Sequence, residues 1–138
     1  MRISDVITRI SAECPGFEYV DHILTSAADF ARPAALVAPV RSIGARPSIN
    51  IPGGYSQDVE LILGVYIVLD RKQNGATGSG AADQFDDLVV DLRAAMINWA
   101  ASGLIEPITY AGGEMAPYEP SVVTWREDFR ALFEVRYP

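Results

Sequence analysis

The sequence predicts a single α+β domain over residues 1–138, built on a mostly antiparallel sheet of about four strands with helices packed on one face. Three observations carry this prediction. Apolar residues recur at helical spacing near the N-terminus and again in residues 82–101. Residues 58–70 form an almost continuous apolar run, whereas residues 122–137 alternate between core-type and polar positions. The expected order of elements is α-(α)-β-β-α-β-β.

The N-terminal segment carries a single apolar stripe, so we expect a helix over residues 3–13. Pro15 and Gly16 follow directly and stop it, because neither residue continues a helix well. The stripe consists of Ile3, Val6, Ile7 and Ile10.

Residues 17–31 mix two patterns. We expect a brief extended piece near Tyr19 and then a short helix that is capped near Thr25 or Ser26. Pro33 ends this helix, because the residue before a proline avoids the helical region.

The next segment predicts a strand, a loop and a second strand. Residues 34–40 form the first strand, which Pro39 confines to a sheet edge or ends. Gly44–Gln57 is rich in glycine and proline and predicts a loop of roughly 15 residues, a length that is often functional. Residues 58–70 form the central strand, because both of its faces are largely apolar.

A second long loop is expected at Arg71–Gly80, followed by a helix over residues 82–101 that Ser102-Gly103 ends. The apolar stripe of this helix should pack on the sheet and form the core. It consists of Phe85, Leu88, Val89, Leu92, Met96 and Trp99.

The last third of the chain is expected to be β-structure. Residues 107–110 form a short strand, Gly112-Gly113 and the Pro117/Pro120 region form a turn or wide connection, and residues 122–137 form a long strand. One side of the long strand carries Trp125, Glu127, Phe129, Ala131, Phe133 and Val135, and the other carries Arg126, Asp128, Arg130, Leu132, Glu134 and Arg136.

The charge balance disfavours nucleic-acid binding. Eleven basic and eighteen acidic residues give a net charge of −7, and the basic residues are scattered. The longest apolar run, Val59–Leu69, is too short to span a bilayer and contains Glu60, so we expect no membrane association. The N-terminus shows no signal-peptide pattern.

The reactive residues do not predict an enzyme. Cys14 and His22 lack a neighbouring nucleophile motif, and a lone buried cysteine usually behaves as a small apolar residue. An acidic helix face offers oxygen ligands from one direction only, which favours a solvated surface over a metal site. The aspartates concerned are Asp83, Asp86, Asp87 and Asp91, and we expect no metal and no cofactor.

Gly75–Gly80 offers an alternative, because a glycine-rich loop between a strand and a helix can bind nucleotide phosphates. The spacing is GxxGxG rather than GxGxxG, and no Lys-Ser/Thr pair follows. The aspartates downstream would also repel a phosphate. A connecting loop is the favoured interpretation, and a small nucleotide-binding domain stays the less favoured one.

The order of these pieces resembles the tail terminator (tail completion) proteins of tailed bacteriophages. The N-terminal helix is followed by Pro33–Pro39, similar to the family's first strand, then by a long strand, a Gly-rich loop and one long helix. Tyr110–Gly113 and Trp125–Phe129 resemble the closing hairpin of that family.

This resemblance implies a structural protein of the virion, not an enzyme. Such a protein forms a hexameric ring at the tail-neck junction, stops polymerisation of the major tail tube protein and presents a surface to head-tail completion proteins, while DNA only passes through. Another neck or head-tail connector subunit is the alternative. From the residues we expect an oligomer interface at Arg126, Asp128, Arg130 and Glu134, and partner contacts at Gly53, Gly54, Tyr55, Arg71, Lys72 and Gly75.

Overall fold

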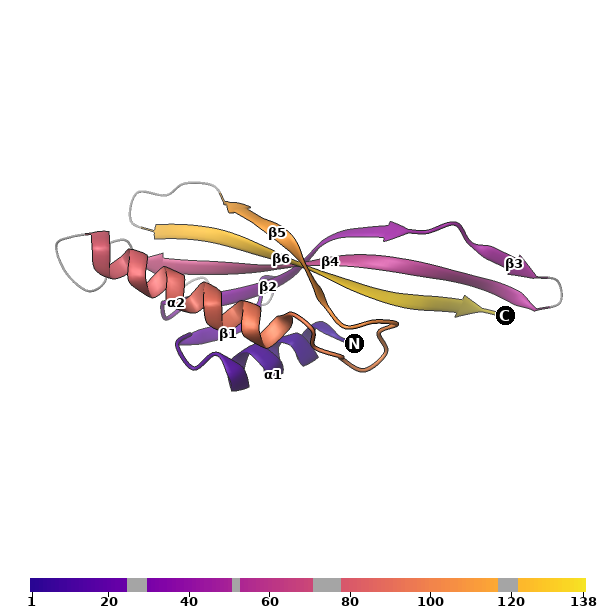
Figure 1. Cartoon of the computed structure of the whole chain (residues 1–138), viewed down its shortest axis with the longest axis horizontal. Helices are drawn as coiled ribbons and strands as arrows, with labels where there is room; N and C mark the ends of the chain where they lie inside the picture. The colour runs from indigo at the N-terminus through magenta and orange to yellow at the C-terminus, as the bar shows by residue number, and fades with distance from the viewer. Residues whose placement is uncertain (25–29, 51–52, 71–77, 117–121) are drawn as a thin grey trace.

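The computed structural model describes residues 1–24, 30–50, 53–70, 78–116 and 122–138. Within these residues the chain forms two helices and one six-stranded sheet, which confirms the α+β class (Figure 1). The elements are α1 (Ile3–Glu13), β1 (Tyr19–His22), β2 (Ala34–Gly44), β3 (Ser48–Asn50), β4 (Gly54–Asp70), α2 (Gly78–Met96), β5 (Thr109–Met115) and β6 (Val122–Tyr137).

The expected sheet of about four antiparallel strands is wrong in detail, because the sheet has six strands and is mixed. Its order is β1-β2-β4-β6-β5, with β3 added beside β4. β1 runs parallel to β2, and the other neighbours are antiparallel. The longest pairing joins β4 to β6 without a register shift, from Tyr55 opposite Tyr137 to Asp70 opposite Val122.

Both helices pack on the same face of this sheet, toward one end of it (Figure 1). The expected helix over residues 3–13 is confirmed, and Val6 and Ile10 of its stripe are fully buried. The stripe of α2 also forms the core as predicted. Leu88, Leu92 and Met96 share one buried cluster with Leu63, Val65, Ile67 and Phe129 of the central strands, and Trp99 packs against its margin.

A second, smaller cluster lies on the opposite face, at the end of the sheet where β1 pairs with β2. Tyr66 and Val68 of β4 pack there with Leu36 of β2 and with Tyr19 and Phe30. The central strand is therefore covered on parts of both faces, as its apolar pattern predicts.

The expected long loop at Gly44–Gln57 is wrong, because most of this segment is strand. β2 continues through Pro39 to Gly44, β3 follows, and β4 begins at Gly54 rather than at residue 58. Pro39 is tolerated because β1 pairs only as far as Val37, so the proline lies on an open edge. A strand without a fully buried face needs no apolar alternation, so the sequence of this segment did not reveal its strands.

Three elements in the second half also differ from the prediction. α2 begins at Gly78, so the expected loop at Arg71–Gly80 is wrong for Gly78–Gly80, and β5 covers Thr109–Met115 rather than residues 107–110. α2 ends at Met96, not at residue 101, because Asn98 adopts a left-handed conformation (φ 66°) and its N–H donates to Ile108 O at 2.7 Å. Gly112-Gly113 lies inside β5 rather than in a turn. β6 has the predicted bounds, Val122–Tyr137.

Three further expectations lie outside the described residues. These are the short helix capped near Thr25 or Ser26, the loop residues Arg71, Lys72 and Gly75, and the Pro117/Pro120 connection.

A bulge in β2 marks the point where the sheet leaves the helical layer. The register between β2 and β4 shifts between Pro39 and Arg41, so that Val40 has no partner in the ladder. Val40 instead packs over Gly64, where a Cβ atom would lie 2.5 Å from its Cγ2 atom. Glycine is therefore required at this position, because bulges bend a strand and bring side chains close to the neighbouring backbone.

Replacing Leu92 by alanine tests whether the α2 stripe is the core face. Leu92 is fully buried, so Leu92→Ala should lower the free energy of unfolding by about 2–5 kcal/mol. Val90→Ala on the exposed side of the same helix is the matched control and should change it by less than about 0.5 kcal/mol. Urea unfolding measures both, and a loss below about 1 kcal/mol for Leu92→Ala would place the core elsewhere.

Candidate functional site

The sheet extends well beyond the two helices and forms a projecting arm (Figure 1). We define the arm as the strand residues on the far side of the bulge: Arg41–Gly44 of β2, β3, Gly54–Glu60 of β4 and Leu132–Tyr137 of β6. The segment between α2 and β5 reaches only its base, where the Ile105 N–H donates to Leu132 O at 2.8 Å. The C-terminus lies at the tip of the arm (Figure 1).

One face of the arm is apolar and continues the face on which the helices pack. The register places Val59 opposite Phe133 and Tyr55 opposite Tyr137, on the same side as the buried pair of Leu63 and Phe129. Within the described chain, neither buried cluster includes the apolar residues of this face. They are Ile49, Tyr55, Val59, Phe133, Val135 and Tyr137, and Ile49 and Tyr137 are 66% and 62% exposed.

The tip of the arm is held by short polar contacts. The Tyr55 hydroxyl donates to Gln57 Oε1, and Gln57 Nε2 donates to Ala45 O at 2.6 Å. The Tyr55 ring also contacts Tyr137 at 6.1 Å between centroids. Gly54 has a φ of +82° and leaves no room for a Cβ atom, which would lie 2.5 Å from Tyr137 O. Of the expected partner-contact residues, the structure thus places Gly53, Gly54 and Tyr55 at this tip.

The expected interface residues of β6 lie on the opposite face of the sheet and have partners within the chain. Arg126 binds Asp128 at 2.8 Å and Glu114 at 2.7 Å, and the hydrogen bond to Asp128 is the main cause that holds the pKa of Arg126 above its usual value. Arg130 pairs with Glu60 across the β4–β6 ladder. Glu134 pairs with Arg136. This face therefore presents paired charges of both signs.

The sequence pattern did not single out one polar cluster on the core face. Glu127 is fully buried, and the Arg93 guanidinium binds both of its carboxylate oxygens, at 2.9 and 3.0 Å. Trp125 Nε1 donates to the same carboxylate at 2.7 Å, and Arg93 also donates to the Tyr110 hydroxyl. The bond to Glu127 raises the pKa of Arg93, and desolvation is the main cause of a raised pKa at Tyr110. The signal in the sequence that could have revealed this cluster is Glu127 itself, because a carboxylate on an otherwise apolar strand face needs a partner when it is buried.

This cluster ties α2 to β5 and β6 and so fixes how far the helix covers the sheet. The Arg93 guanidinium also lies 4.7 Å from the centre of the Tyr110 ring, and Tyr110 packs edge-on against Phe129. We interpret it as structural, because every charged group in it is paired.

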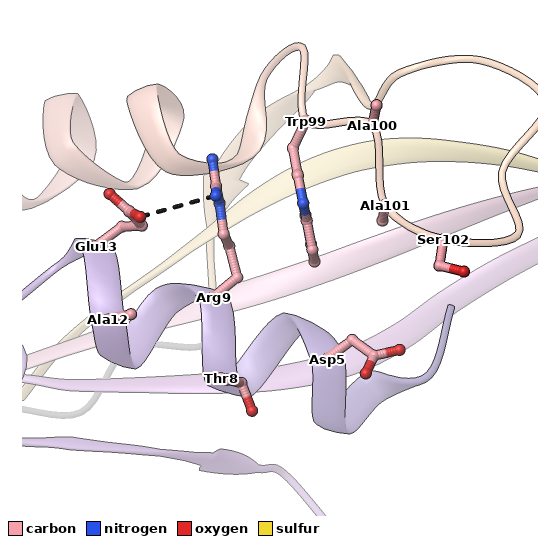
Figure 2. Close-up of a pocket in the computed structure, with 9 residues that line it drawn as sticks. All are labelled: Asp5, Thr8, Arg9, Ala12, Glu13, Trp99, Ala100, Ala101 and Ser102. Carbon is pink, nitrogen blue, oxygen red and sulfur yellow. Dashed lines mark ion pairs between the residues drawn. The ribbon is translucent and has the colours of Figure 1, made fainter.

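A groove of about 450 Å³ runs between α1 and the segment after α2 (Figure 2). Arg9 occupies its middle, 5.3 Å from the centre of the Trp99 ring, and pairs with Glu13 at 3.7 Å. Its Nε atom donates to Ala95 O. Figure 2 shows the side chains that line this groove. Arg9 is the one cation among them and is already bound within the chain, so the groove offers no evident ligand chemistry.

The reactive groups do not converge on a site. Cys14 is 1% exposed, and burial raises the pKa of its thiol to about 11, which leaves it unreactive near neutral pH. His22 accepts a hydrogen bond from the Leu24 N–H. Among the described residues there is no group of three metal-ligating side chains and no helix long and apolar enough to cross a membrane.

An uncovered apolar sheet face with exposed backbone edges is the property of a subunit that packs against other proteins. The comparisons with known proteins agree with this class. The family model "Phage tail terminator protein" matches residues 1–138, so the chain belongs to the phage tail terminator family. It is therefore a structural component of a phage virion tail.

A solved structure supports the fold independently. A chain in the structure "Virion of native gene transfer agent (GTA) particle" matches with a TM-score of 0.58 and 11% identity, over 94% of this chain and 92% of that one. The comparison with curated proteins finds no match.

Arg93→Met tests the structural role of the buried cluster. The substitution removes both guanidinium hydrogen bonds from the buried Glu127 carboxylate, so it should cost at least about 2 kcal/mol of unfolding free energy. Tyr110→Phe removes one exposed hydroxyl and should cost less than about 1 kcal/mol. Adding Glu127→Gln to Arg93→Met should recover part of the loss. Equal stability of Arg93→Met and the unmodified protein in urea unfolding would contradict the account.

Proposed function

We propose that the protein forms a hexameric ring that caps the head-proximal end of the tail tube, stops its polymerisation and binds the head-tail completion proteins at the tail-neck junction. Membership of the tail terminator family supports this proposal. The observation that carries it is the arm, because a monomer gains nothing from a long apolar sheet face that its own helices do not cover.

The open strand edges supply a way to join subunits. β5 pairs with β6 only as far as Arg130, so beyond Leu132 the outer edge of β6 has no strand partner among the described residues. β2 is likewise unpaired on its outer side beyond Val37, where the pairing with β1 ends. Unpaired backbone donors and acceptors bind a neighbouring strand readily, and a head-to-tail contact of this kind closes into a ring when the rotation permits.

The charged face of β6 fixes the register of the ring in this proposal. Arg126, Asp128, Arg130 and Glu134 present alternating signs, and complementary charges set specificity and register more than affinity. Gly53, Gly54 and Tyr55 at the arm tip contact a partner protein, as do Arg71, Lys72 and Gly75. The net charge of −7 keeps DNA from adhering as it passes through the ring. The protein acts without catalysis and without a cofactor.

Tube assembly with the major tail tube protein tests the function. The unmodified protein should shorten the tubes seen by electron microscopy in proportion to its concentration. A variant that exchanges one pair of charges, Glu60→Arg with Arg130→Glu, keeps the pair within the chain but inverts the signs shown to a neighbour. It should fold normally and cap tubes less well.

Three outcomes separate the possibilities. Normal capping by the exchanged variant would move the interface away from this face. Tubes of unlimited length with the unmodified protein would overturn the terminator function. Binding to head-completion proteins without any effect on tube length would instead indicate another neck or connector subunit.

A further inference from the structure

The backbone groups that β6 exposes at the free edge of the arm can be identified from its contacts. The Leu132 carbonyl accepts a hydrogen bond from the Ile105 N–H, so it points away from β4. Because the direction of the backbone groups alternates along a strand, Glu134 and Arg136 also direct their N–H and C=O groups outward. Beyond Leu132 this edge has no strand partner among the described residues.

The opposite edge of the arm, on β2, is free over a similarly short stretch. The Ala45 N–H donates to Asp58 O at 2.9 Å, so it faces β4. By the same alternation Ser42 and Gly44 direct their backbone groups outward, and both residues are exposed. Toward the helices this edge is interrupted by Pro39, which has no N–H, and by the bulge that follows it.

The strand directions decide how these two edges can meet. β2 and β6 both run antiparallel to β4, so they are parallel to each other. A second copy that continues the sheet with its helices on the same side therefore brings its β2 alongside β6 in the parallel sense. The outward residues of β6 carry side chains on the face away from the helices, whereas Ser42 and Gly44 of β2 lie on the helix side. A parallel pair needs this offset, because the bonding residues of one strand lie between those of the other.

The charges on the face away from the helices also complement each other between copies. Asp58 and Glu134 lie directly opposite in the β4–β6 ladder, where like charges repel, and the one ion pair that either forms among the described residues joins Glu134 to Arg136. Arg41 lies on the same face, is exposed and forms no ion pair there. In its own chain it lies opposite Ile62, about 13 Å along the ladder from Asp58. The acid pair of one copy and the lone arginine of another are therefore matched.

We propose that adjacent copies in the ring join these edges into a continuous sheet, with residues 132–137 of one copy parallel to residues 41–44 of the next and Glu134 beside Arg41. In this register the Ser42 N–H donates to Glu134 O. The contact joins two different edges, so it is head-to-tail and generates a ring when it closes. The inference rests on the proposed ring and adds the edges, the strand direction and the register that build it.

Charge reversal on each edge, alone and together, tests the register. Arg41→Glu and, separately, Glu134→Arg should each lose the ring in native mass measurements, with and without tubes, at a concentration at which the unmodified protein forms it. Combining the two substitutions should restore the ring, because the charges then match again. Thermal unfolding checks that the subunits stay folded. Glu106→Arg, an exposed reversal away from both edges, should leave the ring intact.

A proline on the β2 edge tests the backbone hydrogen bonds separately from the charges. Ser42→Pro removes an outward N–H that has no acceptor in the free subunit, and edge strands tolerate proline at such positions. The variant should stay folded and lose the ring. Ser42→Ala keeps the N–H and should form the ring normally, which separates the backbone bond from any role of the side chain.

Cysteine cross-linking reads the contact in assembled protein. Ser42→Cys with Val135→Cys should convert the subunit band into a ladder of its multiples under oxidation, because the proposed register places these positions side by side. Within one chain β4 separates them by about 10 Å, which is beyond the reach of a disulfide. Ser42→Cys with Met115→Cys on β5 should give no ladder. Cys14 is buried and does not compete.

The outcomes keep this inference apart from the function on which it rests. A ring that caps tubes but is indifferent to the charge reversals and gives no ladder overturns the edge pairing and leaves the terminator function standing. Disulfide-linked dimers of Ser42→Cys alone or of Val135→Cys alone also overturn it, because like edges would then meet. A protein that neither forms rings nor limits tube length removes both.

Discussion

The pairing of β4 with β6 is the constraint on which the rest of the structure depends. It runs from Tyr55–Tyr137 to Asp70–Val122 without a shift in register, so it fixes which side chains share a face over its whole length. At one end this register gathers Leu63, Phe129 and their neighbours under the helices. At the other end it extends the same apolar face into the arm, where no helix follows. The core and the uncovered apolar face are therefore two halves of one ladder.

The mismatch between strand and helix lengths creates the exposed surface. Strands of 16 and 17 residues are much longer than α2, whose 19 residues rise less than half as far per residue. The Arg93–Glu127 pair anchors the helix at one end of the ladder, and the bulge at Val40 over Gly64 bends β2 where the helical layer stops.

Sequence patterns predicted the parts of the fold that have a buried face. The helix stripes, the central strand and the alternation of β6 were all found, because burial imposes a period on the sequence. The extension of β2, the strand β3 and the start of β4 were mistaken for a loop, because neither face of these segments is fully buried and only full burial imposes a clear period. For the same reason the sequence did not predict the arm. The end of α2 depends on the left-handed conformation of Asn98, which an apolar pattern does not predict.

Hydrogen exchange of the free subunit and of the tube-bound protein tests the central claim, that the arm is the assembly surface. In the free subunit, the outer edges of β2 and β6 beyond the bulge should exchange fast, while the central strands under the helices stay protected. Assembly should slow exchange in Arg41–Gly44 and Phe133–Tyr137 and leave the helix-covered half unchanged. Capped tubes in which the arm exchanges as fast as in the free subunit would contradict the account.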